Sequence, residues 1–241
     1  MFTNTGNDHR SIHPRLLMND GESRSFLPLQ YEKLSKNMMK EKAKSFFSLM
    51  DNRRTTRHFS EETVEKELIE FAIKTASTAP SGAHLQPWTF VAVNNQKLKS
   101  EIRDAAELEE KKTYDERMPE AWAEVIQPLG TDYVKTHLTS APWIVVLFRQ
   151  SKRLRMNGEW GPTYYSMESC GIAAGLFISA IHNMGLTTLT HTPSPMGFLR
   201  DLLGRPAHEH AMLVMPVGYP SPDAMVPDLT RKPLDDVAVF I

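Results

Sequence analysis

Apolar side chains in the first third of the chain recur every three or four positions, the spacing of one helix face. The pattern predicts an amphipathic helix over residues 31–50, with the stripe Leu34, Met38, Met39, Ala43, Phe46, Phe47 and Met50. A second helix is expected to begin at Ser60, a suitable N-cap followed by Glu61 and Glu62, and to end before Pro80. Residues 1–25 are polar with little periodicity, and we expect a flexible N-terminal arm.

Further along, β-branched and continuous apolar runs predict strands separated by helices. Strands are expected at residues 88–93, 143–148, 185–193, where the strand runs into a loop, 212–217 and, at the C-terminus, 237–241. Residues 164–183 are almost uniformly apolar and predict a central helix, in which Gly171 and Gly175 would let another backbone approach closely. Residues 199–204 predict a short helix. The fold class that follows is α/β or α+β, with four or five strands sandwiched by helices.

Composition narrows the class of protein. The 241 residues are 41% hydrophobic and 24% charged, as in ordinary globular proteins, and a net charge of -1 gives no case for binding nucleic acid or an anionic membrane. The single cysteine, Cys170, lies in an apolar run and cannot form an intramolecular disulfide. We find no signal sequence and no apolar run long enough to span a bilayer, and we expect a soluble, cytoplasmic protein without a membrane anchor.

A cluster of arginines carries the strongest chemical signal. Arg53, Arg54 and Arg57 lie within five residues of one another, and Arg231 and Lys232 follow near the far end of the chain. Guanidinium groups bind phosphate oxygens through parallel N–H donors, so the pattern suggests a phosphorylated cofactor. The turn Pro80-Ser81-Gly82-Ala83-His84 would let backbone N–H groups approach a flat ligand. Taken alone, a basic run is more often a solvated face and such a turn an ordinary loop.

Several other kinds of site are not supported. The chain has no Gly-x-Gly-x-x-Gly after a strand, no phosphate-binding P-loop and no Gly-x-Ser-x-Gly elbow. His208-Glu209-His210 lacks the further ligands that a metal site needs, and we expect no metal. Cys170 has no activating base beside it in the sequence.

Several motifs in the same order resemble those of the iodotyrosine deiodinases, a family within the nitroreductase superfamily. They are RRTTR at 53–57, TAPSGAH at 78–84, PWTF at 87–90, LGRPAHE at 203–209, PVGYP at 216–220, VPDL at 226–229 and RKPL at 231–234. The resemblance extends from about residue 25 to the C-terminus. It implies an α+β, three-layer α/β/α sandwich with a nitroreductase-like FMN-binding fold and a central mixed sheet, formed by residues 26–241 as one domain. It also implies an intertwined homodimer with FMN at the subunit interface.

The resemblance also assigns roles to individual residues. It implies that FMN is bound by Arg53, Arg54, Thr55, Arg57, Pro80, Ser81, Thr190, His191, Thr192 and Arg231. Thr192 occupies the position that donates a hydrogen bond toward flavin N5, and the Ala83 N–H would donate to the substrate phenolate. The family carries threonine where this chain has His191. Its animal members have an N-terminal membrane anchor, which we do not expect in this protein.

Residues 105–135 are expected to form a substrate lid. Glu110 and Tyr114 are four positions apart on one predicted helix face, and Lys135 follows after a connecting stretch. A carboxylate and an ammonium are the minimal complement to a zwitterionic amino acid, and in the family resembled these three residues clamp iodotyrosine. On composition alone, an exposed charged helix at residues 107–117 is the favoured interpretation, and the family resemblance reverses that preference.

The implied activity is FMN-dependent reductive dehalogenation of halogenated tyrosines to tyrosine and halide through one-electron steps. The substrates would be mono- and diiodotyrosine, with bromo- and chlorotyrosine as further candidates, and the electrons would come from NADPH or NADH, directly or through a reductase. One alternative is a general FMN nitroreductase or quinone reductase that works by hydride transfer and is indifferent to Glu110, Tyr114 and Lys135. Another is a flavin- or amino-acid-binding protein without turnover.

Overall fold

The computed structural model describes residues 26–241. The arm expected at residues 1–25 lies outside the described residues. A four-stranded sheet forms the centre, in the order β1 (Trp88–Val93), β2 (Trp143–Gln150), β6 (Glu209–Gly218) and β5 (Thr187–Thr188). The pairings between these strands are antiparallel, and a parallel bridge between Thr55 and Thr188 makes the sheet mixed.

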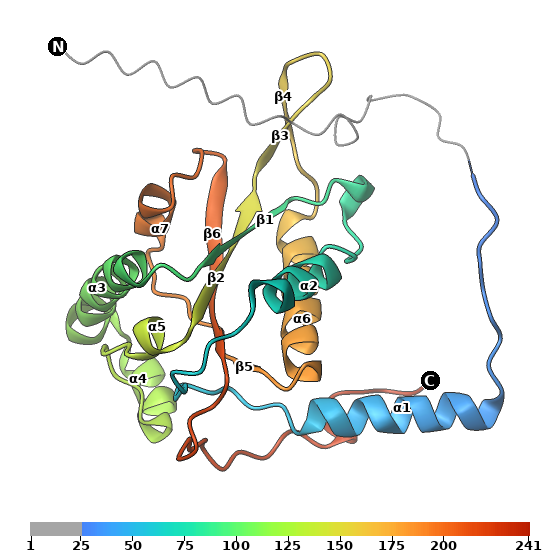
Figure 1. Ribbon diagram of the computed structural model, residues 1–241, viewed down its shortest axis with the longest axis horizontal. Helices are drawn as coiled ribbons and strands as arrows, with labels where there is room; N and C mark the ends of the chain where they lie inside the picture. Colours follow the sequence, from blue (N-terminus) through green and yellow to red (C-terminus); the bar gives the residue numbers. More distant parts are fainter. Residues whose placement is uncertain (1–25) are drawn as a thin grey trace.

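Helices cover both faces of the sheet (Figure 1). One face carries α2 (Lys66–Ala76) and α6 (Ser166–Asn183), and the other carries α3 (Gln96–Lys112), α5 (His137–Ser140) and α7 (Gly197–Leu202). Strand β2 contributes to both layers, because successive side chains of a strand point to opposite faces. Val145 and Leu147 belong to the first core cluster, while Ile144, Val146 and Phe148 belong to the second. The expected three-layer α+β sandwich is confirmed.

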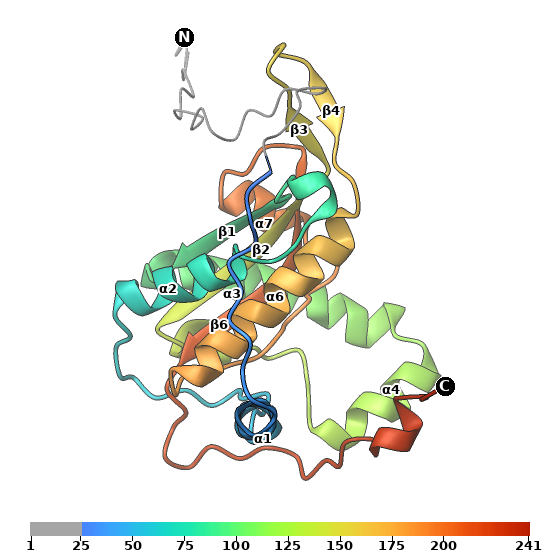
Figure 2. The same cartoon turned by 90° about the vertical axis from the view of Figure 1, so that its right-hand side faces the viewer.

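Helix α1 (Lys36–Asp51) stands apart from these layers, as Figures 1 and 2 both show. Ser35 is its N-cap and accepts a hydrogen bond from the Met38 N–H at 3.3 Å. The helix buries no residue within the described chain, so the apolar stripe read from the sequence, including Phe46 and Phe47, remains exposed. Near its C-terminal end the Leu49 carbonyl lies 2.8 Å from the His182 ring Nε2 on α6.

Two predicted elements are wrong. Helix α2 begins at Lys66 rather than at Ser60. Residues 59 and 60 are extended instead, because Phe59 pairs with Pro220 and the Ser60 N–H bonds the Tyr219 carbonyl. The predicted C-terminal strand is also missing: after a 3₁₀ turn at Leu234–Asp236, residues 237–241 pair with no strand of the described chain and are exposed.

Other elements differ in extent. The strand expected at 185–193 shrinks to two residues, after which His191 forms an isolated bridge with Val214. A hairpin of β3 (Lys152–Leu154) and β4 (Trp160–Pro162), which the sequence did not predict, projects beyond the sheet in both views (Figures 1 and 2). Between α3 and α5 lie a π-helical turn (Thr113–Arg117), α4 (Glu120–Ile126) and a 3₁₀ turn (Gln127–Leu129). Across residues 26–241, no helix has both the length and the apolar character to cross a bilayer.

Candidate active site

The arginines from the two ends of the sequence meet. Arg53, Arg54, Arg57 and Arg231 line one cavity of about 350 Å³, together with Thr55, Leu129, Pro227, Leu229 and Thr230. Arg231 bonds the Asp51 carboxylate and the Arg53 carbonyl, both at 2.9 Å, and Arg54 donates to the Pro227 carbonyl. The C-terminal segment is thus tied back to the end of α1. Lys232 is exposed and does not contribute to this lining.

The positive charges that line this cavity favour the binding of an anion. Burial lowers the pKa of Arg53, and the positive charges of Arg231 and Arg54 lower it further. Asp51 is the carboxylate that pairs with Arg231. Cations that repel one another in a partly buried cavity gain most from a ligand with several negative oxygens, such as a phosphate.

Three further cavities share residues with this one. Arg53 and Arg54 also line a cavity of about 180 Å³ that borders Ile178 and His182 of α6. Arg53 and Thr55 also line a cavity of about 360 Å³ that reaches Thr190 and the Gly175–Ser179 turn of α6. Arg57 also lines a cavity of about 230 Å³ with Lys135, His137 and residues of the 130–136 segment. Arg57 therefore connects the arginine cluster with the predicted substrate lid.

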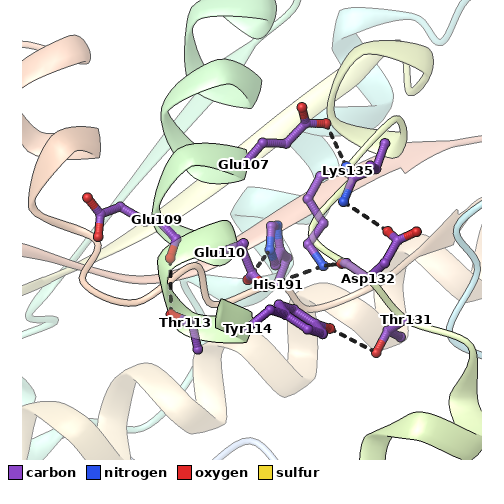
Figure 3. A network of polar contacts seen from close by, with 10 residues as sticks. Glu107, Glu109, Glu110, Thr113, Tyr114, Thr131, Asp132, Lys135 and His191 are labelled. Carbon is purple, nitrogen blue, oxygen red and sulfur yellow. Dashed lines mark hydrogen bonds and ion pairs between the residues drawn. The ribbon is translucent and has the colours of Figure 1, made fainter. Parts of the chain in front are cut away.

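Glu110, Tyr114 and Lys135 come together as their spacing predicted (Figure 3). Lys135 Nζ lies 3.4 Å from Glu110 Oε2 and 5.6 Å from the centre of the Tyr114 ring. The Tyr114 hydroxyl donates to Thr131 Oγ1 at 3.2 Å. The side chains of Glu110 and Lys135 are 15% and 9% exposed, so residues 107–117 are more than a solvated charged helix.

Neighbouring residues fix this cluster. The Lys135 N–H donates to Glu107 Oε1 at 2.7 Å, and Arg103 pairs with the same oxygen at 2.6 Å. Lys135 Nζ also donates to the Asp132 carbonyl. Burial acts to raise the pKa of Glu110, but the hydrogen bond from His191 and the charge of Lys135 outweigh it, and the pKa is lowered overall.

The segment 190–192 lies beside this cluster. The main chain of His191 is bonded to Val214 in both directions, at 2.8 and 2.9 Å, and its ring Nε2 lies 3.0 Å from Glu110 Oε1. Thr190 and Thr192 on either side are exposed. No local pattern indicates the contact between His191 and Glu110, because 81 positions separate them.

The turn with Pro80, Ser81 and Ala83 lies elsewhere. Its Gly82 N–H donates to Ser169 Oγ in the first turns of α6, and a Cβ on Gly82 would come within 2.6 Å of the Tyr164 carbonyl. The arginine cavities border Gly175, Ser179 and His182, ten or so residues further along α6, which corresponds to about 15 Å of helix. One chain therefore does not bring the turn and the arginines around one ligand.

Ala83 in this turn is conformationally unusual. Its φ of 51° and ψ of 24° lie in the left-handed region, which costs a non-glycine residue free energy. In residues 26–241 the hydrogen bonds that close the turn are donated by the His84 and Leu85 N–H groups, and the Ala83 N–H donates to no acceptor. The turn therefore presents a donor held by a strained backbone.

The motifs set aside at the sequence level have structural partners. Glu209 pairs with Arg205 at 2.6 Å and accepts a hydrogen bond from Thr89 at 2.7 Å, and the His208 ring contacts the Trp160 ring with the two planes tilted by 48°. Cys170 is buried, with its pKa raised to about 11 chiefly by that burial. Among residues 26–241, no group of three or more His, Cys, Asp or Glu side chains could hold a metal ion.

Comparison with known proteins decides the family. The model of the nitroreductase family matches residues 50–219. The iodotyrosine deiodinase of Haliscomenobacter hydrossis is 47% identical over 217 residues, which are 90% of this chain and 97% of that protein. The chain belongs to the iodotyrosine deiodinases of the nitroreductase family. The human iodotyrosine deiodinase 1 is 41% identical over 91% of this chain and 76% of its own length.

Solved structures agree with this placement. The crystal structure of an oxidised iodotyrosine deiodinase bound to FMN and 3-iodo-L-tyrosine superposes with a TM-score of 0.70 at 28% identity, covering 81% of this chain and 97% of that one. An FMN-bound nitroreductase from Bacteroides fragilis gives a TM-score of 0.62 at 16% identity, which supports the fold alone. The deiodinase relatives favour dehalogenation over the alternative of a general nitroreductase.

Proposed function

We propose that this protein is an FMN-dependent enzyme that reductively removes halogen from halogenated tyrosines. The observation that carries the proposal is that the Glu110–Tyr114–Lys135 cluster adjoins the arginine cavity through Arg57, in a chain of the iodotyrosine deiodinase family. A phosphate-binding cavity beside a paired carboxylate and ammonium suits a phosphorylated cofactor next to an amino acid.

The residues present fit FMN. Arg53, Arg54, Arg57 and Arg231 would hold its phosphate, since their repulsion in one cavity is relieved by a dianion. Thr55 and the segment Thr190–Thr192 would lie along the remainder of the cofactor, with Thr192 as the donor nearest the reactive ring nitrogen. When bound, FMN supplies the electrons for the reaction.

The amino-acid part of the substrate would exchange an existing ion pair for two new ones. Glu110 and Lys135 now neutralise each other across 3.4 Å. A zwitterion offers its ammonium to Glu110 and its carboxylate to Lys135, so both buried charges stay paired when their mutual contact opens. The Tyr114 ring forms an apolar wall, and its hydroxyl is already held by Thr131. Closure of residues 105–135 over the substrate would exclude water.

The chain also stabilises charge on the substrate ring. The net reaction joins one halotyrosine, two electrons and one proton to give tyrosine and halide. A hydrogen bond from the Ala83 N–H would stabilise the ionised phenol, and the phenolate oxygen donates electron density by resonance to the ortho carbon that is protonated. The fixed conformation of Ala83 means that this donor needs no reorganisation when the substrate binds.

We infer that the working unit is a homodimer. Pro80, Ser81 and Ala83 lie about 15 Å along α6 from the arginine cavities, so a second copy would have to supply them to the same ligand. The exposed stretch of α6 suits this contact: a Cβ added at Gly171 or Gly175 would meet no atom of the described chain within 4 Å. The exposed C-terminal residues 237–241 and the stripe of α1 offer further apolar surface to a partner.

One experiment tests the function directly. The FMN-loaded protein is reduced with dithionite without oxygen and titrated with 3-iodotyrosine while the flavin spectrum and free iodide are followed together. Stoichiometric iodide release with flavin reoxidation is expected. Reoxidation by nitroaromatics but not by iodotyrosine would refute the proposal. Steady-state turnover with NADPH or NADH, with and without an added flavin reductase, identifies the electron donor.

A further inference from the structure

His191 makes a contact with the amino-acid clamp that the proposed reaction does not use. Its Nε2 lies 3.0 Å from Glu110 Oε1, and Lys135 occupies the other carboxylate oxygen at 3.4 Å. An ionised carboxylate can only accept hydrogen bonds, so Nε2 carries the proton and donates. The His191 side chain is 9% exposed, and this hydrogen bond therefore lies in a largely dry environment where it contributes more than at the surface.

The imidazole is held more firmly than Glu110 itself. Both main-chain groups of His191 are bonded to Val214 of β6, which anchors the residue to the central sheet. Glu110 instead lies in the last turn of α3, immediately before the π-helical turn at Thr113–Arg117. Figure 3 shows the ring of His191 directed at the Glu110 carboxylate. The contact thus ties the predicted lid to the rigid part of the fold.

The charges around His191 decide what it does. Glu110 reaches it from α3 and His137 from α5, where the two imidazole rings meet edge to face with centres 5.3 Å apart. Lys135 lies across Glu110, and Arg57 and Arg103 act on His137 from further away. His191 Nδ1 and His137 Nε2 have no hydrogen-bond partner within the described chain. The His191 ring contacts one oxygen of Glu110 and leaves the other, which Lys135 now occupies, available to a ligand cation.

We propose that His191 is a positioning residue for amino-acid recognition, which holds Oε1 of Glu110 so that Oε2 is the oxygen presented to the substrate ammonium. The inference rests on the proposed function. When Lys135 turns from Glu110 to the substrate carboxylate, His191 is the remaining partner of the Glu110 side chain in the described structure. It keeps the carboxylate in place and leaves one lone-pair face open. His191 thereby selects a substrate that carries an ammonium over one that lacks it.

The test compares two ligands that differ only in that ammonium: 3-iodotyrosine and 3-(3-iodo-4-hydroxyphenyl)propanoate. Their Kd values are measured by quenching of flavin fluorescence in the oxidised holoprotein, and the ratio of the two isolates the ammonium contribution because phenol ionisation and ring stacking are common to both. His191→Leu removes the donor. His191→Gln places an amide N–H near the position of Nε2, and His191→Asn ends short of it. His210→Gln, an exposed histidine bonded to Ser151, is the control.

The ratio of the Kd of the propanoate to the Kd of 3-iodotyrosine measures the preference for the ammonium. This ratio is expected to fall about tenfold in His191→Leu, a factor that corresponds to about 1.4 kcal/mol. His191→Asn behaves like His191→Leu, His191→Gln restores most of the preference, and His210→Gln keeps it.

Two failures are distinguishable. If the wild type binds both ligands equally, the proposed amino-acid clamp of Glu110 and Lys135 falls and the inference with it, whereas loss of iodide release would refute the proposed function itself. If the wild type prefers iodotyrosine and His191→Leu keeps that preference, the inference alone is overturned. An equal loss in His191→Gln and His191→Leu also overturns it.

Discussion

Replacing Lys135 by methionine is the most direct test of the amino-acid clamp. Methionine keeps much of the apolar stem and removes the charge. At 3.4 Å and an effective dielectric of about 20, the attraction between Lys135 and Glu110 is about 5 kcal/mol before desolvation is subtracted. A substrate carboxylate at a similar distance would experience a comparable attraction, most of which offsets the cost of leaving water.

The net contribution of a hydrogen bond to a charged group is about 1.5–3 kcal/mol, so Lys135→Met should weaken the binding of 3-iodotyrosine about 10- to 150-fold. The Kd is obtained by titrating the oxidised holoprotein and following flavin fluorescence. 3-Iodotyramine lacks the carboxylate, and its Kd should change little. Lys111→Met is the matched control, because this lysine is 54% exposed and pairs with Asp115.

An equal loss for iodotyrosine and iodotyramine would mean that Lys135 does not contact the substrate carboxylate. No loss for either would refute the clamp altogether. Thermal unfolding of the variant, measured in parallel, shows whether the buried Glu110 left with His191 alone also lowers stability.

Three further predictions follow from the cavity and the core. Arg231→Ala should weaken FMN binding at least about tenfold, as the loss of a charge-assisted hydrogen bond implies, whereas Lys232→Ala should change FMN binding little. The Kd of FMN is measured for each apoprotein, and equal effects of the two substitutions would contradict the assigned cavity. The folded state holds the pKa of His137 at about 3, below its usual 6.5. Between these two pH values the unfolded state therefore binds more protons than the folded state. The free energy of unfolding should fall as the pH drops from about 6.5 toward 3. Chemical denaturation at several pH values measures the free energy of unfolding. If its dependence on pH is the same in His137→Gln as in the wild type, His137 is not responsible. Cys170, with a pKa of about 11, should react with a thiol reagent at pH 8 only in denaturant, and rapid labelling of the native protein would contradict its burial.

Many elements of the fold follow from local patterns. The continuous apolar run at 143–148 and the uniformly apolar run at 164–183 predict β2 and α6 correctly, because a strand or helix buried on all sides tolerates few polar residues. The local pattern fails at Ser60 and at the C-terminal residues, because long-range pairing decides the structure there. Pairing of residues 59 and 60 with 219 and 220 overrides a good N-cap, and the strand-like composition of 237–241 forms no strand without a partner edge in the described chain.

For the site, the residue types can be read from the sequence: guanidinium groups for a phosphate, and Glu110 and Tyr114 on one helix face with Lys135 further along the chain. The packing of helices and strands is needed to show that Arg57 borders both cavities, that His191 holds Glu110, and that the Ala83 turn lies at the opposite end of α6. Periodicity reports neighbours a few residues apart along one element. Contacts between residues tens of positions apart depend on how helices and strands pack, and no local pattern encodes that arrangement.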